Sequence, residues 1–176
     1  MSEPALQVHP FPPLFDEHSR ILILGSFPSV KSREGQYFYH HPQNRFWKVL
    51  AAVLGVETPR TIAEKSAMLH SHHITLWDVI GSCTIAGSSD SSIRDVVPND
   101  LSAIFSGAQI RAVFCNGGTS HRCYKRYAQQ QTGFEAACLP STSPANAGWS
   151  LERLTEAWRV ILPHLSDTEP ANAGNG

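Results

Sequence analysis

The sequence predicts an α/β fold, a three-layer α/β/α sandwich around a mainly parallel four-stranded sheet. Short apolar runs alternate with segments of helical periodicity, which is the pattern of βαβ units. The first run, ILIL at residues 21–24, is continuously apolar, as in a strand buried on both faces. A length of 176 residues and a hydrophobic fraction of 41% suit one globular domain. We expect that domain to span residues 1–165 and residues 166–176 to form a loose C-terminal tail.

Each predicted strand is a short apolar or β-branched run that ends at glycine or a polar loop. The strands are expected at residues 21–24, 72–80, 110–118 and, together with the loop after it, 133–148. Helices are predicted at residues 46–54, 61–70, 101–105, 120–131 and 150–165. Thr61 and Glu64 stand at the spacing of a capping box, and Ser150 is the expected N-cap of the last helix.

Two segments carry no predicted helix or strand. The proline-rich first fifteen residues are expected to lie as an extended arm over the surface. Residues 81–93, GSCTIAGSSDSSI, are small, polar and punctuated by glycine, which predicts a loop.

Charge and cysteine content restrict the class of protein. The net charge is −1 and the pI is near 6.7, so no global positive field attracts a polyanion, although a local basic patch can still hold a few phosphates. The four cysteines form no Cys-x-x-Cys pair and are expected as buried thiols. No apolar run is long enough to span a membrane, and the N-terminus has no signal-peptide pattern, so a cytoplasmic protein is expected.

Function is expected beyond the carboxyl ends of the strands, where open α/β sheets bind their ligands. The segments at those ends are GSFPS (25–29), WDVIGSC (77–83), CNGG (115–118) and LPSTSPANA (139–147). In the last segment, hydroxyl groups and backbone amides can bind phosphate oxygens. Pro144 and its neighbours can form a rigid projection that fills the gap left by a flipped base. An ordinary turn-rich loop is the alternative interpretation of that segment.

Aromatic residues after the first strand are candidates for stacking on a nucleobase. Tyr37, Phe38 and Tyr39 stand among polar residues, which favours at least one exposed stacking ring, whereas a core cluster is the alternative. Phe46 and Trp47 belong to the periodic helix and are expected in the core.

Together these segments resemble the uracil-DNA glycosylase superfamily, and within it the hypoxanthine-DNA (deoxyinosine) glycosylase branch most closely. The run FYHHPQNRFWKVL is similar to the aromatic–His-Pro-x-Asn-Arg-Phe-Trp segment of the related mismatch-specific glycosylases. GSFPS and LPSTSPANA stand where those enzymes have their first and second motifs, and LWDVIGSC is similar to the branch's pattern after the second strand. The resemblance covers roughly residues 21–162 and includes four motifs in the same order.

The resemblance implies roles for particular residues. The mismatch-specific enzymes position water with an Asn in the first motif, where this chain has Phe27; the hypoxanthine branch implies that Asn44 takes over. By position, Tyr39 stacks on the base, Phe27 forms the pocket floor or second wall, and amides around Ser26 and Ser29 bind the purine carbonyl. The DNA contacts implied by the second motif are Ser141, Thr142, Ser143, Pro144 and Asn146.

Charged residues add further candidates. Asp78 can stabilise a cationic sugar or accept a proton, but it can equally cap a loop through backbone hydrogen bonds. His40 and His41 are candidates for contact with the departing base, the DNA or solvent. The candidate phosphate contacts are Lys31, Arg33, Arg122, Lys125 and Arg126, and a solvated helix face is the commoner explanation for the last three.

The predicted function is a monofunctional DNA glycosylase of base-excision repair that hydrolyses the N-glycosidic bond of a flipped deaminated base, which the resemblance implies is hypoxanthine. No lysine is placed as a Schiff-base nucleophile. The alternatives are a uracil or mismatched-thymine glycosylase and a non-catalytic module that binds damaged DNA. A zinc enzyme and a hydrolase built on Cys115 are disfavoured, because the ligand spacing and the nucleophile-elbow pattern are missing. We expect no metal or cofactor, single- or double-stranded DNA as partner, no membrane association and a monomer.

Overall fold

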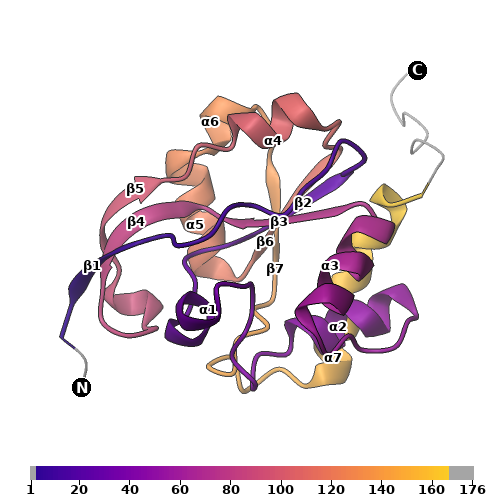
Figure 1. Cartoon of the computed structure of the whole chain (residues 1–176), viewed down its shortest axis with the longest axis horizontal. Helices are drawn as coiled ribbons and strands as arrows, with labels where there is room; N and C mark the ends of the chain where they lie inside the picture. Colours follow the sequence, from indigo (N-terminus) through magenta and orange to yellow (C-terminus); the bar gives the residue numbers. More distant parts are fainter. Residues whose placement is uncertain (1–2, 167–176) are drawn as a thin grey trace.

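The computed structural model describes residues 3–166 and has a parallel sheet at its centre (Figure 1). Four strands form this sheet in the order β3-β2-β6-β7, and each neighbouring pair is parallel. They are β2 (Ile21–Gly25), β3 (Ile74–Asp78), β6 (Ala112–Asn116) and β7 (Ala136–Leu139). All of β2 is buried, as expected of a strand covered on both faces. The predicted four-stranded parallel sheet is therefore confirmed.

Helices cover both faces of this sheet. Figure 1 shows α2, α3 and α7 on one side and α4, α5 and α6 on the other. Side chains of β2 alternate between the two cores: Ile21 and Ile23 face one, Leu22 and Leu24 the other. The three-layer sandwich is confirmed. The helices are α1 (Val30–Gly35), α2 (Phe46–Leu54), α3 (Ile62–Ser71), α4 (Ser102–Gly107), α5 (Gly118–Tyr127), α6 (Gln129–Thr132) and α7 (Leu151–Trp158), with 3-10 turns η1 (Asp90–Ser92) and η2 (Arg159–His164).

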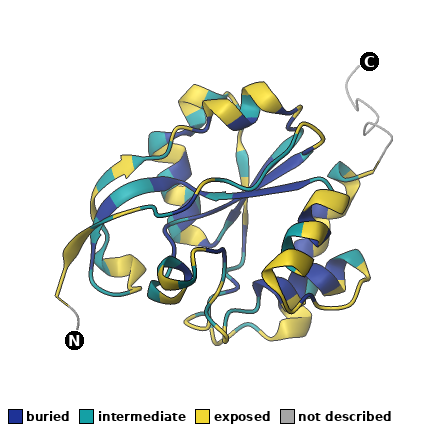
Figure 2. Ribbon diagram, viewed as in Figure 1, coloured by how far each residue is buried: buried dark blue, intermediate teal, exposed yellow. Residues whose placement is uncertain are grey.

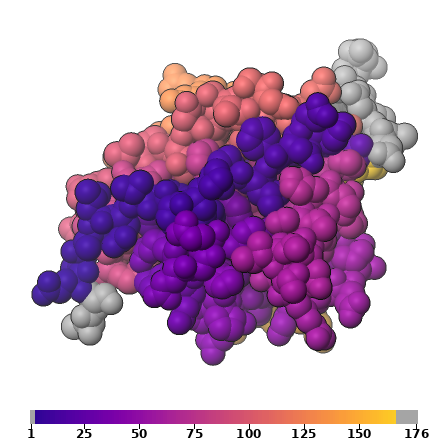
Figure 3. Space-filling model, in the orientation of Figure 1, coloured from indigo at the N-terminus to yellow at the C-terminus, as the bar shows by residue number. Residues whose placement is uncertain are grey.

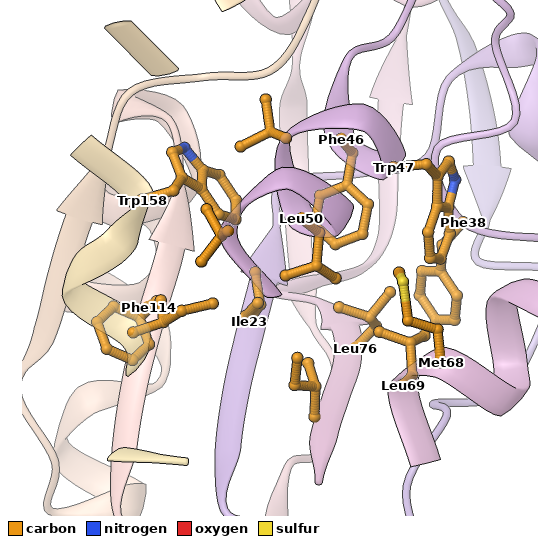
Figure 4. Packing of buried hydrophobic residues seen from close by; sticks show 14 of the residues in the cluster. Ile23, Phe38, Phe46, Trp47, Leu50, Met68, Leu69, Leu76, Phe114 and Trp158 are labelled. Atoms are coloured by element: carbon orange, nitrogen blue, oxygen red, sulfur yellow. The ribbon is translucent and has the colours of Figure 1, made fainter. Parts of the chain in front are cut away.

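The larger core lies between the sheet and helices α2, α3 and α7. Figure 2 shows the central strands buried and the outer surfaces of these helices exposed. In Figure 4, Phe46 and Leu50 of α2 point toward Ile23 of the sheet, with Trp158 of α7 beside them. The Trp158 ring meets Phe46 edge-on at a centroid distance of 5.8 Å, and its indole N–H donates to the Pro140 carbonyl at 3.0 Å. This core therefore also holds the start of the loop after β7.

The structure contains a second sheet that the sequence interpretation missed. Strands β1 (Ala5–Val8), β4 (Ile80–Ile85) and β5 (Arg94–Pro98) pair antiparallel in the order β1-β4-β5. The predicted N-terminal arm is extended as expected, but its residues 5–8 pair as a strand, and the prediction of a loop over residues 81–93 is wrong where β4 lies. Register shifts on both sides of Ser82 interrupt the alternation of β4, and small polar residues occupy its less buried positions.

The N-terminal segment crosses the face of the molecule. It is drawn in indigo in Figure 3, where it lies against later parts of the chain. After β1, the His9 backbone N–H donates to the Gly81 carbonyl at 2.7 Å, and Leu14 forms a bridge with Leu76 of β3. Phe11 between them is buried in the larger core. The segment therefore belongs to the folded domain.

The predicted caps are confirmed, but the last helix is shorter than predicted. The capping box of Thr61 and Glu64 is present, and the Ser150 hydroxyl accepts the Arg153 N–H. Helix α7 ends at Trp158 and passes into η2, which contains Pro163. Proline has no N–H to donate and its ring clashes with the carbonyl four residues before it, so an α-helix cannot continue to residue 165.

The ends of the chain are only partly described. Of the predicted tail, the structure describes Ser166 alone, whose carbonyl accepts a hydrogen bond from Arg111 at 2.8 Å. Residues 167–176 lie outside the described residues. Among the described helices, none has the length and apolar character needed to cross a membrane.

Replacement of Trp158 tests the link between the core and the loop after β7. Trp158→Phe keeps an aromatic ring but leaves the Pro140 carbonyl without its donor, so we expect a loss of about 1–3 kcal/mol in the free energy of unfolding. Urea unfolding measures it. Trp149→Phe is the matched control, since Trp149 is half-buried and its indole N–H has no described acceptor; a smaller loss at Trp158 than at Trp149 would contradict the prediction.

Candidate active site

A cavity of about 530 Å³ opens at the carboxyl ends of three parallel strands. Gly25, Asp78 and Asn116, the last residues of β2, β3 and β6, all line it. This is the edge at which an open parallel sheet is expected to bind its ligand. The structure brings together predicted site residues from four segments of the chain: Ser26, Phe27, Ser29, Tyr39, Asn44, Asp78, Ser141, Thr142, Ser143 and Pro144. A hollow of about 690 Å³ beside α3 holds none of them, so size alone does not identify the site.

Asp78 presents a buried carboxylate to this cavity. Its Oδ2 lies 2.7 Å from Nε2 of His9, and its backbone carbonyl accepts the side-chain amide of Asn99 at 2.9 Å. Among the described residues, no backbone N–H donates to the carboxylate, so the loop-capping alternative is wrong for this side chain. A Cβ on Gly25 would overlap Asp78 Oδ1, and position 25 therefore has to be glycine if the carboxylate is to stay where it is.

His9 is a residue of the site that sequence reasoning missed. It stands in the proline-rich arm, far from every motif, and it reaches Asp78 only because β1 pairs with β4. No signal in the sequence links residues 9 and 78. The pairing of a separate strand decides their contact.

Tyr39 forms one wall of the cavity. Its ring stacks on Phe46 at a centroid distance of 4.0 Å and an interplanar angle of 18°. Its hydroxyl is buried, close to Asp78 and to the side chain of Asn116. Burial, and then the negative charge of Asp78, raise the pKa of this phenol, so it stays protonated at neutral pH.

The prediction of an exposed ring among Tyr37, Phe38 and Tyr39 is wrong. Tyr37 and Phe38 are buried and Tyr39 is half-buried. The cause is the N-terminal segment, whose Phe11 meets the Phe38 ring edge-on at 4.8 Å, together with Trp47, which stacks on Tyr37 at 6.0 Å. A stacking surface for a base is therefore available only inside the cavity, not on the outer surface of this loop.

The hydrogen bonds of Asn44 fix which way its amide points. Its Oδ1 accepts the Phe46 backbone N–H at 3.0 Å and the Thr142 hydroxyl at 2.8 Å. A backbone N–H can only donate, so the accepting atom is the oxygen and Nδ2 is the atom left to bond a ligand. Asn44 lines the cavity as a hydrogen-bond donor.

Thr142 links two loops beneath the cavity wall. Its backbone N–H donates to Asn116 Oδ1 at 3.0 Å, and its hydroxyl accepts from Asn116 Nδ2 at 3.0 Å. The same hydroxyl donates to Asn44. The side chain is fully buried, so the expected DNA contact by Thr142 does not fit its position. Thr142 holds Asn44 in place instead.

Arg45, which the sequence interpretation did not single out, holds the loop after β7. Its guanidinium donates to the carbonyls of Ser143 at 3.2 Å and Asn146 at 3.0 Å, and also to that of Trp149. Its backbone N–H donates to the Thr142 carbonyl at 3.1 Å. Asn146 lies outside the cavity wall and donates its side-chain amide to the Ser141 carbonyl at 3.0 Å. The loop is thus held by side chains within and before it, and Pro144 is exposed at its tip.

The segment after β2 forms the opposite wall. Phe27 is buried against His9, and the guanidinium of Arg33 lies 5.6 Å from its ring centroid. Ser29 caps α1 by accepting the Ser32 N–H at 3.2 Å. Ser26 donates its hydroxyl to Asp90 at 3.1 Å, which places a second carboxyl group, missed in the sequence, on the cavity rim.

The carboxyl group of Asp90 has an altered acidity. The residue as a whole is exposed, but its carboxyl group faces the protein and loses hydration, which raises its pKa. The negative charge of Asp78 raises this pKa further, whereas the hydrogen bond from the Ser26 hydroxyl lowers it.

The remaining histidine and basic candidates differ in whether they line the cavity. His41 lines the cavity and His40 does not. Arg33 donates to the carbonyls of Pro28 and Gly87, so it stabilises local structure. Lys31, Arg122, Lys125 and Arg126 are exposed.

Burial raises the pKa of Cys115 to about 12, which disfavours a thiolate nucleophile there. No group of three or more His, Cys, Asp or Glu side chains suited to a metal occurs within residues 3–166.

The fold and the cavity together define an α/β protein with a candidate ligand site that has aromatic walls and polar side chains. The chain matches the model of the uracil DNA glycosylase superfamily over residues 12–162. It is 34% identical over 155 residues to a hypoxanthine DNA glycosylase of Methanosarcina acetivorans, covering 88% of this chain and 97% of the relative. A hypoxanthine DNA glycosylase of Methanosarcina barkeri is 34% identical over 151 residues, covering 84% and 93%.

A solved structure agrees with these relatives. The solution NMR structure of a candidate uracil DNA glycosylase from Methanosarcina acetivorans has a TM-score of 0.75 at 34% identity and covers 88% of this chain and 96% of that one. This chain belongs to the uracil DNA glycosylase superfamily. The resemblance seen in the sequence motifs is confirmed.

Removal of the Arg45 guanidinium tests whether it holds the loop after β7. Arg45→Met removes the donor to three loop carbonyls, so we expect faster amide hydrogen exchange over residues 141–149 and unchanged exchange in β2 and β6. Mass spectrometry of exchanged peptides measures both. Arg60→Met, at an exposed position, is the control. Equal exchange of the loop in the two variants would rule out this role.

Proposed function

We propose that this protein is a monofunctional DNA glycosylase that releases hypoxanthine from DNA. The observation that carries the proposal is the cavity, which joins the Asp78 carboxylate, the Asn44 amide donor and the aromatic walls of Phe27 and Tyr39. Membership of the uracil DNA glycosylase superfamily supports the reaction, and two relatives named hypoxanthine DNA glycosylase support the base.

The reaction is hydrolysis of the bond between C1′ of the deoxyribose and the base nitrogen. This bond breaks with its electron pair leaving on the base, while positive charge develops on the sugar. Asp78 opposes that charge, because a carboxylate in a partly dehydrated cavity attracts a cation more strongly than one in water. Asn44 Nδ2 donates to the oxygen of the attacking water, and Asp78 accepts the proton that this water loses.

A planar purine enters between the aromatic walls. Base stacking on an aromatic ring contributes about 1–3 kcal/mol per base, and the ring of Tyr39 is already held parallel to Phe46. We propose that backbone amides around Ser26 and Ser29, on the opposite wall with Phe27, bind the purine carbonyl. No lysine is among the residues that line the cavity within the described part of the chain, which supports glycosylase activity without strand cleavage.

The loop after β7 is proposed to hold the DNA. Pro144 is exposed at the cavity mouth, where a stiff residue can replace the flipped base, and Ser141 and Ser143 lie beside it. We propose that the protein acts as a monomer on single- or double-stranded DNA in the cytoplasm, where the nucleoid lies.

Variants of Asn44 separate catalysis from loop support. Asn44→Asp keeps the oxygen that accepts from Phe46 and Thr142 but replaces the Nδ2 donor, whereas Asn44→Ala removes both. If the donor acts in the reaction, both variants release hypoxanthine about 100-fold more slowly than the wild type, as for other transition-state donors. Alkali-labile abasic sites in a duplex with one hypoxanthine measure the rate.

Gln43→Ala, the exposed neighbour, is the control for these variants and should keep wild-type activity. An active Asn44→Asp would assign Asn44 to loop support alone. A wild-type protein that binds this duplex without releasing base would favour a damaged-DNA-binding module. A wild-type protein that releases uracil from a matching duplex, but no hypoxanthine, would make uracil the substrate.

Removal of the Asp78 charge tests the carboxylate. Asp78→Asn keeps the size of the side chain and an oxygen that can accept from His9, so we expect a folded protein whose single-turnover rate falls about 100-fold through the lost charge. Asp95→Asn, at an exposed position of β5, serves as the control. A variant at Asp78 with a rate within threefold of the wild type would show that this charge has no part in the reaction.

A further inference from the structure

The strand β1 delivers a histidine to the carboxylate of the site. Four register pairs join β1 to β4, and the His9 backbone N–H extends this pairing by donating to the Gly81 carbonyl at 2.7 Å. The side chain of His9 is 3% exposed, and its Nε2 lies 2.7 Å from Asp78 Oδ2. The contact is therefore fixed by backbone pairing on one side and by burial on the other.

The surroundings of His9 define its tautomer. The Phe11 backbone N–H points to Nδ1 at 3.4 Å, and because an N–H can only donate, Nδ1 is the acceptor. The ring proton then resides on Nε2 and is donated to Asp78. The rings of Phe11, Phe27 and Trp77 meet the imidazole edge-on at centroid distances of 4.6, 6.1 and 6.0 Å and surround it on several sides.

The two oxygens of Asp78 therefore have different neighbours. Oδ2 is held by His9, while Oδ1 lies against Gly25, next to the Tyr39 hydroxyl and at the cavity. A buried carboxylate without a donor is costly, and it lowers that cost by rotating toward another donor or toward solvent. Such a rotation would move negative charge away from the place where the sugar cation forms.

We propose that His9 is a positioning residue of the glycosylase reaction, which holds the Asp78 carboxylate with Oδ1 oriented toward the reacting sugar. This inference rests on the proposed function. His9 exchanges no proton in the reaction: its Nε2–H bond stays formed while the water proton goes to Oδ1. The N-terminal strand is thereby a part of the active site, although it contributes no atom that touches the DNA.

Two substitutions of His9 separate the hydrogen bond from the packing. In His9→Gln the side-chain amide can place an N–H near the position of Nε2, whereas His9→Leu fills similar space and has no donor. We expect the single-turnover rate of hypoxanthine release to fall about 100-fold in His9→Leu and less than tenfold in His9→Gln. Affinity for a duplex with a stable abasic-site analogue should change less than threefold in both, because His9 does not face the DNA. His18→Leu is the control, since His18 is exposed on the same segment.

A double variant tests whether His9 acts through Asp78. If it does, His9→Leu combined with Asp78→Asn is no slower than Asp78→Asn alone, because the two changes remove one effect. Additive losses would overturn the proposal, as would a folded His9→Leu with a rate within threefold of the wild type. Either result leaves the proposed function intact, provided that the wild type releases hypoxanthine.

The pair itself can be observed without activity. The ring-nitrogen NMR signals of His9 in the wild type should show a proton on Nε2, and Asp78→Asn should shift the Nε2 signal. This measurement decides the matter if His9→Leu does not fold. A His9 protonated on Nδ1, or an Nε2 signal that ignores Asp78→Asn, would overturn the proposal. A wild type that releases no base would overturn the proposed function and the role of His9 with it, even if the pair is observed.

Discussion

The site depends on the point at which one stretch of chain leaves the parallel sheet. Strand β3 ends at Asp78, only Val79 follows, and β4 begins at Ile80 in the antiparallel sheet (Figure 1). The Val79 N–H still donates to the Gly25 carbonyl at 2.9 Å, so the divergence of the two sheets is held at a defined place. The cavity opens there, and the absence of a side chain at Gly25 leaves room for the Asp78 carboxylate in its wall.

Each sheet supplies a different kind of residue to this cavity. The parallel sheet supplies strand ends, with Asp78 and Asn116 at one edge, because its strands all run in the same direction. The antiparallel sheet supplies neighbours of those ends: β1 brings His9 to Asp78, and the turn between β4 and β5 brings Asp90 to Ser26. The strand ends of the parallel sheet therefore form the cavity wall, and the antiparallel sheet adds the residues that contact Asp78 and Ser26.

Hydrogen bonds between the two motif loops set the geometry of the Asn44 amide. Asn44 precedes α2, and Thr142 follows β7, yet Thr142 joins Asn44 to Asn116 through one buried hydroxyl. Arg45, next to Asn44, holds the same loop by its carbonyls. The position of Asn44 and the shape of the loop after β7 are thus coupled, because the neighbouring residues 44 and 45 both bind that loop.

The sequence by itself determined the parallel sheet, its two helical layers and most of the cavity wall. Apolar periodicity and caps are local signals, and the ends of parallel strands must meet at one edge, so GSFPS, WDVIGSC and LPSTSPANA could be assigned to one site. Only the tertiary structure decided that β1, β4 and β5 pair, that Tyr37 and Phe38 are buried, and that His9 contacts Asp78. Strands with bulges and polar faces carry little hydrophobic pattern, and a contact between residues 9 and 78 depends on the pairing of distant backbones, which leaves no periodic signal in the chain.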